Sequence, residues 1–97
     1  MKKIDSLILL INALSKSEKK ALYLQAGENP TEKAYMKIFD IIDKKNITDI
    51  ENIKKNYAKY YPINSFVPEA NYLYQHILST LVSLAIKKNA NITYIIK

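Results

Sequence analysis

The sequence contains no cysteine, no tryptophan and no arginine, and it has only one glycine and one histidine. The absence of cysteine excludes disulfides, zinc–thiolate centres and thiol catalysis, and it suits a reducing cytoplasm. One histidine cannot build a histidine-rich metal site, and one glycine cannot form a glycine-rich phosphate loop. A β-sandwich would need many more turn residues. We therefore expect a cytoplasmic protein that holds no metal and no cofactor.

The charge is one-sided, because 15 lysines stand against nine acidic residues and give a net charge of +6. Such a balance favours nucleic acid or a membrane surface as a partner. Arginine, however, is the better ligand for phosphate and guanine, and the chain has none. Lysine, asparagine, isoleucine and tyrosine all have A/T-rich codons, so genome bias is an alternative explanation for the abundant lysine. The charge alone therefore carries little functional information.

The N-terminal stretch "MKKIDSLILLINALSKS" has the outline of a signal peptide, with two lysines followed by an apolar run. Asp5 precedes the run, Asn12 interrupts it, and no A-x-A cleavage site follows. The uninterrupted run from Leu7 to Ile11 is far shorter than the ~20 residues that a membrane span needs. We expect neither a signal peptide nor a membrane segment.

Helix start signals recur along the chain. Ser15 to Glu18 fits the capping box S-x-x-E, in which the serine and the glutamate each bond to the other's backbone N–H. Asn29 to Glu32 and Thr48 to Glu51 have the same spacing of cap and acid. Gly27 marks a helix end, because glycine tolerates the left-handed turn found there. Each of these signals borders a run with apolar residues at helical spacing.

These signals predict an all-α protein, a compact bundle of about five helices in one domain that covers residues 1–97. The fifth helix is expected to be long and central, with a short apolar tail behind it. A loop at residues 61–68 precedes it, and we expect Ile63, Phe66 and Val67 to pack onto the core. The predicted helices cover about residues 3–14, 16–26, 30–44, 49–60 and 68–88, and the tail covers residues 89–97.

No set of side chains suited to catalysis emerges from the sequence. His76 is the only histidine, and Ser79 and Ser83 follow it on the same predicted helix, where serines are usually solvated or packed. Asp40 and Asp43 are one turn apart and could share a cation, but the lysines that follow them indicate a solvated helix end. We therefore expect a non-enzyme without a small-molecule substrate.

The fifth predicted helix is apolar on more than one side. If its main stripe faces the core, the remaining apolar residues form an exposed patch, and such patches mark interfaces. The alternative is that the first helix and the tail cover both of these sides of the fifth helix. The candidate partner-binding residues are Tyr72, Val82, Ile86, Tyr94, Ile95 and Ile96.

A helix-turn-helix is the competing interpretation. The fourth helix carries lysines, and the fifth begins with amides that can read adenine. The candidate nucleic-acid residues are Lys54, Lys55, Lys59, Asn71 and Gln75. Residues 61–67, however, are longer than the usual turn of three or four residues. No charged side chain other than that of a protonated His76 stands between Glu69 and Lys87, whereas a recognition helix needs a polar, basic face.

The order of segments also resembles a known group. The stretches "LINALSKSEKKALYL", "KAYMKIFDIIDK", "IKKNY" and "ANYLYQHILSTLVSL" follow one another. This order is similar to the N-terminal region of uncharacterised bacterial proteins of the Bacteroidetes type, which continue into tetratricopeptide-like helical repeats. The resemblance covers about residues 7–86, and its most distinctive pieces are residues 14–20 and 71–74. It implies a helical fold and further helices beyond residue 97, whose absence would leave a face of the fifth helix uncovered.

The sequence therefore predicts a non-enzymatic interaction or scaffolding module. It would dock through the last helix and the tail onto further helices, a second copy or a protein partner. A helix-turn-helix DNA-binding regulator is the alternative.

Overall fold

A computed structural model describes the backbone of residues 2–96 and the side chains of residues 4–30 and 32–86. Over this part of the chain every regular element is helical, which confirms the all-α class, the five helices and the long last helix. Two short 3₁₀ helices lie between them. The elements are α1 (Lys2–Ala13), α2 (Lys16–Gln25), η1 (Pro30–Glu32), α3 (Ala34–Asp43), α4 (Ile50–Ala58), η2 (Ile63–Ser65) and α5 (Phe66–Ile96).

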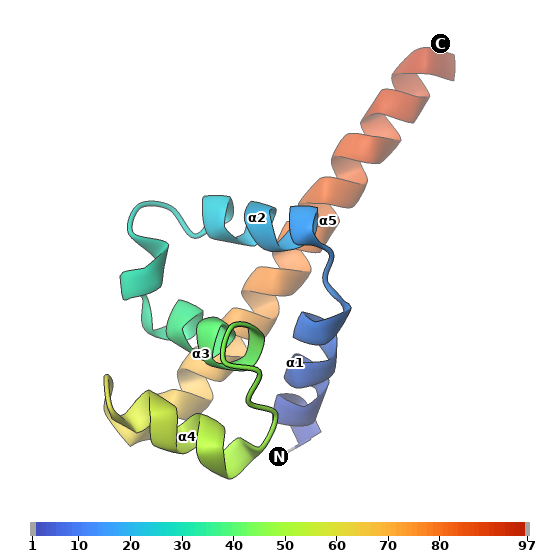
Figure 1. Cartoon of the computed structure of the whole chain (residues 1–97). Coiled ribbons are helices and arrows are strands. Elements are labelled where there is room, and N and C mark those ends of the chain that lie inside the picture. The colour runs from blue at the N-terminus through green and yellow to red at the C-terminus, as the bar shows by residue number, and fades with distance from the viewer. Residues whose placement is uncertain (1, 97) are drawn as a thin grey trace.

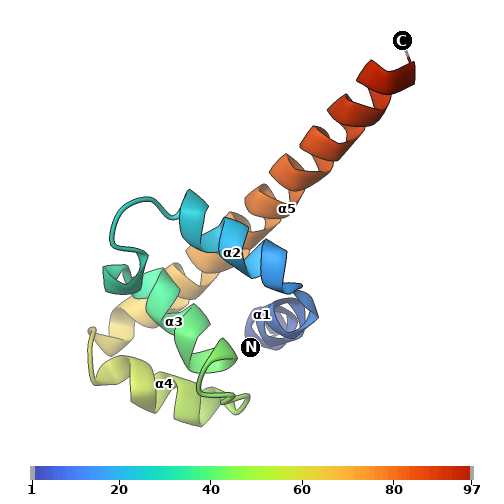
Figure 2. The same cartoon turned by 45° about the horizontal axis from the view of Figure 1, so that its top comes forward.

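The first four α-helices gather around the N-terminal half of α5 (Figure 1). Helix α3 contacts α1, α4 and α5, and α5 also contacts α1 and α2. The C-terminal half of α5, drawn in red, projects beyond the other helices in both views (Figures 1 and 2). The molecule is therefore elongated, with principal extents of 53 × 28 × 21 Å.

Helix α3 lies at the centre of the core. Five of its ten residues have fully buried side chains, and they extend around more than one side of the helix, so that neighbours must enclose it. Helix α5 faces it with one stripe whose members recur three and four residues apart. The buried residues of α3 are Met36, Ile38, Phe39, Ile41 and Ile42, and those of the α5 stripe are Phe66, Ala70, Leu73 and Ile77.

The capping box predicted at the start of α2 is confirmed. The Ser15 Oγ accepts from the Glu18 backbone N–H at 3.2 Å, and the Ser15 N–H donates to the Glu18 Oε1 at 2.7 Å. Gly27 follows the helix with φ +86°, the left-handed conformation that favours glycine. The sequence therefore predicted both ends of α2 from local signals.

The other two predicted boxes are wrong in detail. Asn29 has φ 52° and makes no side-chain cap, and residues 30–32 form η1. The Lys33 N–H donates to the Pro30 carbonyl, and Lys33 itself is extended, so that α3 starts only at Ala34. The predicted helix at residues 30–44 is thus split. At α4 the cap is Asp49, whose Oδ2 accepts from the Asn52 N–H at 3.3 Å, and Thr48 lies outside the helix.

Helix α5 is longer than predicted at both ends. It begins at Phe66 rather than at residue 68, and it continues through Ile96 rather than ending at residue 88. Pro68 fits in its first turn, where a missing N–H leaves no helical bond unmade. Phe66 is buried as predicted, but Ile63 and Val67 are 51% and 41% exposed, so their predicted packing is wrong.

Substitution of single residues tests which side chains cap α2 and α4. We expect Ser15→Ala and Asp49→Ala each to lower the free energy of unfolding by about 1 kcal/mol, because each leaves a helix N–H without its acceptor. Thr48→Ala serves as the matched control and should change it by less than about 0.5 kcal/mol. Denaturant unfolding measures all three. A loss in Thr48→Ala as large as that in Asp49→Ala would contradict the assignment.

Candidate functional site

Exposed apolar side chains occur at several places on the fold, among them Leu9 and Leu24, and three of them share one face of α5, which we call the outer face. Its members are three or four residues apart, all are exposed, and they lie opposite the stripe that packs on α3. Tyr72 and Val82 are each 57% exposed and Ile86 is 61% exposed, whereas Leu73 and Ile77 are 0% and 1% exposed. The outer face consists of Tyr72, Gln75, Ser79, Val82 and Ile86.

The sequence identified only part of this face. Tyr72, Val82 and Ile86 were predicted as partner-binding residues, and the structure places all three on the exposed side of α5. The other three predicted members, at positions 94–96, lie outside the described side chains. Gln75 and Ser79 were not assigned to the face, although the same spacing of three and four residues would have included them.

An aromatic cluster holds the N-terminal end of the outer face. The ring centroid of Tyr35, on α3, lies 4.6 Å from that of Tyr72 and 5.3 Å from that of His76. The His76 Nε2 is also 3.3 Å from the Leu22 carbonyl oxygen of α2. Burial, and then the neighbouring Tyr72 and Glu69, raises the pKa of the Tyr35 hydroxyl. His76 thus joins α2, α3 and α5, and the cluster positions Tyr72 although its ring is exposed.

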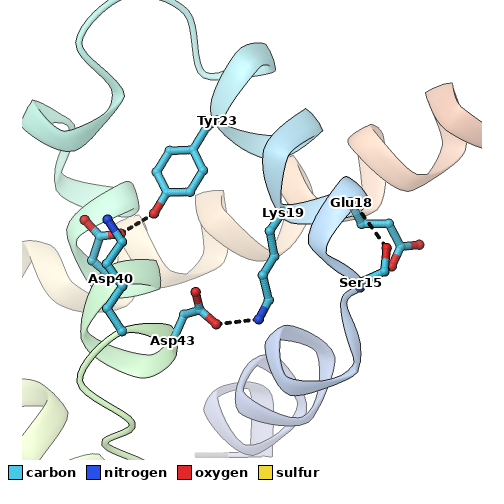
Figure 3. A network of polar contacts seen from close by, with 7 residues as sticks. Ser15, Glu18, Lys19, Tyr23, Asp40 and Asp43 are labelled. Carbon is cyan, nitrogen blue, oxygen red and sulfur yellow. Dashed lines mark hydrogen bonds and ion pairs between the residues drawn. The ribbon is translucent and has the colours of Figure 1, made fainter.

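A second polar cluster joins α2 to α3 (Figure 3). The Lys19 Nζ lies 2.6 Å from the Asp43 Oδ1, and the Tyr23 hydroxyl donates to the Asp40 Oδ1. The Lys44 Nζ is 3.8 Å from the same Asp40 oxygen. Burial, followed by the hydrogen bond to Asp40, raises the pKa of the Tyr23 hydroxyl. Asp40 and Asp43 are therefore paired with side chains of this chain, and we interpret the cluster as a clamp between the two helices.

The candidate nucleic-acid residues have different environments. Lys55 and Lys59 are exposed on and just after α4, whereas Lys54 is half-buried with its Nζ 5.9 Å from the centre of the Phe66 ring. Gln75 lies on the outer face, and Asn71 is half-buried. Among the residues described, no hydrogen bond or ion pair joins the lysines to these two amides. The five residues thus differ in exposure, with the lysines on and just after α4 and the amides on α5.

The link between α4 and α5 is itself ordered. It contains η2, and the Tyr57 hydroxyl and the Ser65 Oγ are hydrogen-bonded at 2.5 Å. Tyr57 is fully buried and packs edge-on against Phe66, with ring centroids 5.4 Å apart. This connection fixes the start of α5 to the core and differs from the short turn of a helix-turn-helix.

Within the described residues, no group of three or more histidine, aspartate or glutamate side chains is placed to hold a metal ion. No helix in this part of the chain has both the length and the apolar composition to cross a membrane. In comparisons with protein-family models, curated proteins and solved structures, the chain matches none.

The α2–α3 clamp can be tested by removal of one hydroxyl. We expect Tyr23→Phe to lower the free energy of unfolding by about 1.5 kcal/mol, because Asp40 loses a donor to its charged oxygen. Tyr60→Phe is the control, because Tyr60 is 55% exposed and its ring, which faces Lys37, is retained. If the two variants lose equal stability in denaturant, the clamp does not contribute.

The pH dependence of the free energy of unfolding should differ between Tyr23→Phe and the wild type in a definite direction. Because the folded-state pKa of Tyr23 is raised, the folded protein holds this proton more tightly than the unfolded chain does. The stability that this raised pKa contributes is fully present below the ordinary tyrosine pKa of about 10. It is lost as pH rises through the folded-state pKa. Above about pH 10, stability should therefore fall less steeply in Tyr23→Phe than in the wild type.

Proposed function

We propose that the protein is a non-enzymatic helical interaction module and that the outer face of α5 is its contact surface. The observation that carries the proposal is the exposure of Tyr72, Val82 and Ile86 on a helix whose opposite face is built into the core. Large apolar side chains that gather on one exposed face mark interaction sites more often than isolated ones do.

The outer face is supported along the part of α5 that lies against the other helices. Leu73 and Ile77 anchor the helix from the inner side, and Tyr72 packs against Tyr35. A surface that is already ordered loses less conformational entropy on binding than a flexible segment does. The N-terminal part of the outer face, around Tyr72, thus favours a contact that is made without refolding.

The spacing of the outer face indicates what kind of element it receives. Residues three and four apart form a ridge along a helix, and such ridges pack into the grooves of another helix. Docking of one apolar helix face on another is a common recognition mode. We therefore propose that the module docks onto a helical element, in a second copy of the chain or in a protein partner.

The DNA-binding alternative has less support. A recognition helix presents polar and basic side chains at its N-terminal end, but the exposed residues there, such as Val67 and Tyr72, include no lysine. The exposed Lys55 and Lys59 lie on and just after α4 instead. Titration of labelled duplex DNA at low and moderate salt separates the two functions, because contacts to phosphate give steeply salt-dependent affinity.

Site-specific photo-crosslinking tests the proposed contact surface. A benzoyl-phenylalanine at position 82 should give a discrete adduct in the cells that make the protein, because this position lies within the outer face. The same group at position 52, which is exposed on α4, is the matched control and should give none. Addition of Ile86→Glu should abolish the adduct by placing a charge in the contact. Equal adducts from positions 82 and 52, or none from 82, would refute the proposal.

A further inference from the structure

The link between α4 and α5 carries exposed apolar side chains with lysines beside them. Tyr60, Ile63 and Val67 are 55%, 51% and 41% exposed, and they come from eight consecutive residues, 60–67. We propose that this stretch, the α4–α5 link, binds the surface of an anionic lipid bilayer. None of its residues belongs to the outer face of α5, so this inference is independent of the proposed function.

Lysine ammonium groups lie against the aromatic rings of the α4–α5 link. The Lys37 Nζ, from α3, is 3.9 Å from the centre of the Tyr60 ring, and the Lys54 Nζ is 5.9 Å from that of Phe66. Lys59 is exposed and directly precedes Tyr60 in the chain. Among the described side chains, none of these three lysines forms an ion pair. Their charges can therefore pair with an external anion.

Acidic side chains are few around the α4–α5 link. None occurs in residues 52–68, where there are three lysines. Glu32 and Glu69 lie near Tyr61, whose hydroxyl donates to the Glu32 carbonyl at 2.6 Å. Burial, and then Tyr57 and these two acids, raises the pKa of the Tyr61 hydroxyl. The charged side chains that lie next to the link thus have a positive excess.

The α4–α5 link has a defined shape within the fold. The Ser65 Oγ donates to the Pro62 carbonyl at 2.7 Å and is hydrogen-bonded to the hydroxyl of the buried Tyr57. Because η2 continues directly into α5, Ile63 and Val67 both project from the N-terminal end of that helix. Side chains that are already held in place lose less conformational entropy when they bind.

The α4–α5 link also lies at one end of the molecule. In both views it forms the corner at which the chain turns from α4 into α5, and the projecting half of α5 points away from it (Figures 1 and 2). The link is thus reached from outside the bundle, at the end opposite the C-terminal half of α5. Contact there leaves the projecting half of the outer face accessible.

The types of side chain in the α4–α5 link favour a lipid surface over other polyanions. The Tyr60 ring is apolar and its hydroxyl is polar, which suits the boundary between headgroups and acyl chains. Ile63 and Val67 gain from burial in the acyl region, whereas a nucleic-acid backbone offers them no apolar contact. Lysine side chains extend from such a region to the anionic headgroups. A contact of this kind lies in the interface and needs no membrane-spanning segment.

A tryptophan at position 60 tests insertion directly, because the chain contains no other tryptophan. When vesicles of equimolar phosphatidylcholine and phosphatidylserine are added to the full chain, the emission of Tyr60→Trp should shift to shorter wavelength, because the ring leaves water. Leu24→Trp is the matched control and should not shift, since Leu24 is 73% exposed on α2, away from the link. No shift in Tyr60→Trp, or equal shifts in both variants, would overturn the proposal.

Co-sedimentation with the same vesicles separates the charged and apolar contributions. Lys59→Gln and Ile63→Ser should each weaken binding about fivefold, because one loses a contact with anionic headgroups and the other an apolar side chain. Lys20→Gln and Leu24→Ser are the matched controls, both exposed on α2, and should weaken it by less than about twofold. Circular dichroism checks that all four variants are folded. Losses in the controls as large as those in the link variants would contradict the assignment.

The lipid and nucleic-acid alternatives give different results in the wild type. Vesicles of phosphatidylcholine alone should bind more weakly than the anionic vesicles, and added salt should weaken binding to the latter. Equal binding to both kinds of vesicle would contradict the role of the lysines. Binding of a labelled single-stranded oligonucleotide without any binding to vesicles would assign the link to nucleic acid and overturn the proposal. None of these outcomes affects the outer face, which crosslinking at position 82 tests separately.

Discussion

The burial of α3 is the constraint on which the rest of the structure depends. Five of its side chains are completely buried and lie around more than one side of the helix, so no single neighbour can cover them. Helices α1, α4 and α5 all contact it. Burial of each large apolar side chain contributes about 1.5–3 kcal/mol, so the enclosure of α3 is a large favourable term in the fold. The positions of the other helices follow from the need to complete this enclosure.

The way α5 meets α3 determines which part of the protein stays exposed. Only one stripe of α5 is needed against α3, and its last fully buried residue is Thr80. Val82 and Ile86 lie beyond this residue on the outer face and are 57% and 61% exposed. The Tyr35, Tyr72 and His76 cluster and the clamp around Asp40 fix α2 and α3 beside α5. These contacts keep the N-terminal part of the outer face exposed, which is why we propose this face as the contact surface.

Local signals in the sequence predicted the helices well, but the contacts between residues far apart in the chain could not be predicted from the sequence. The box of Ser15 and Glu18 could be read because its partners are three residues apart. Asn29 has the same spacing to Glu32, but it caps no helix, because the hydrogen bond from the Lys33 N–H to the Pro30 carbonyl closes a 3₁₀ turn there. Apolar spacing identified Tyr72, Val82 and Ile86 as exposed. The pairs Lys19–Asp43 and Tyr23–Asp40 join residues far apart in the chain, and no pattern in the sequence marks them.

The central claim is that α5 has one face that holds the fold together and another that does not, and a pair of equivalent truncations tests it most directly. Ile77 is 1% exposed and Ile86 is 61% exposed on the same helix. In dilute protein, Ile77→Ala should lower the free energy of unfolding by about 2–5 kcal/mol, whereas Ile86→Ala should change it by less than about 0.5 kcal/mol. Losses of similar size from the two truncations would contradict the account, because the outer face would then belong to the core.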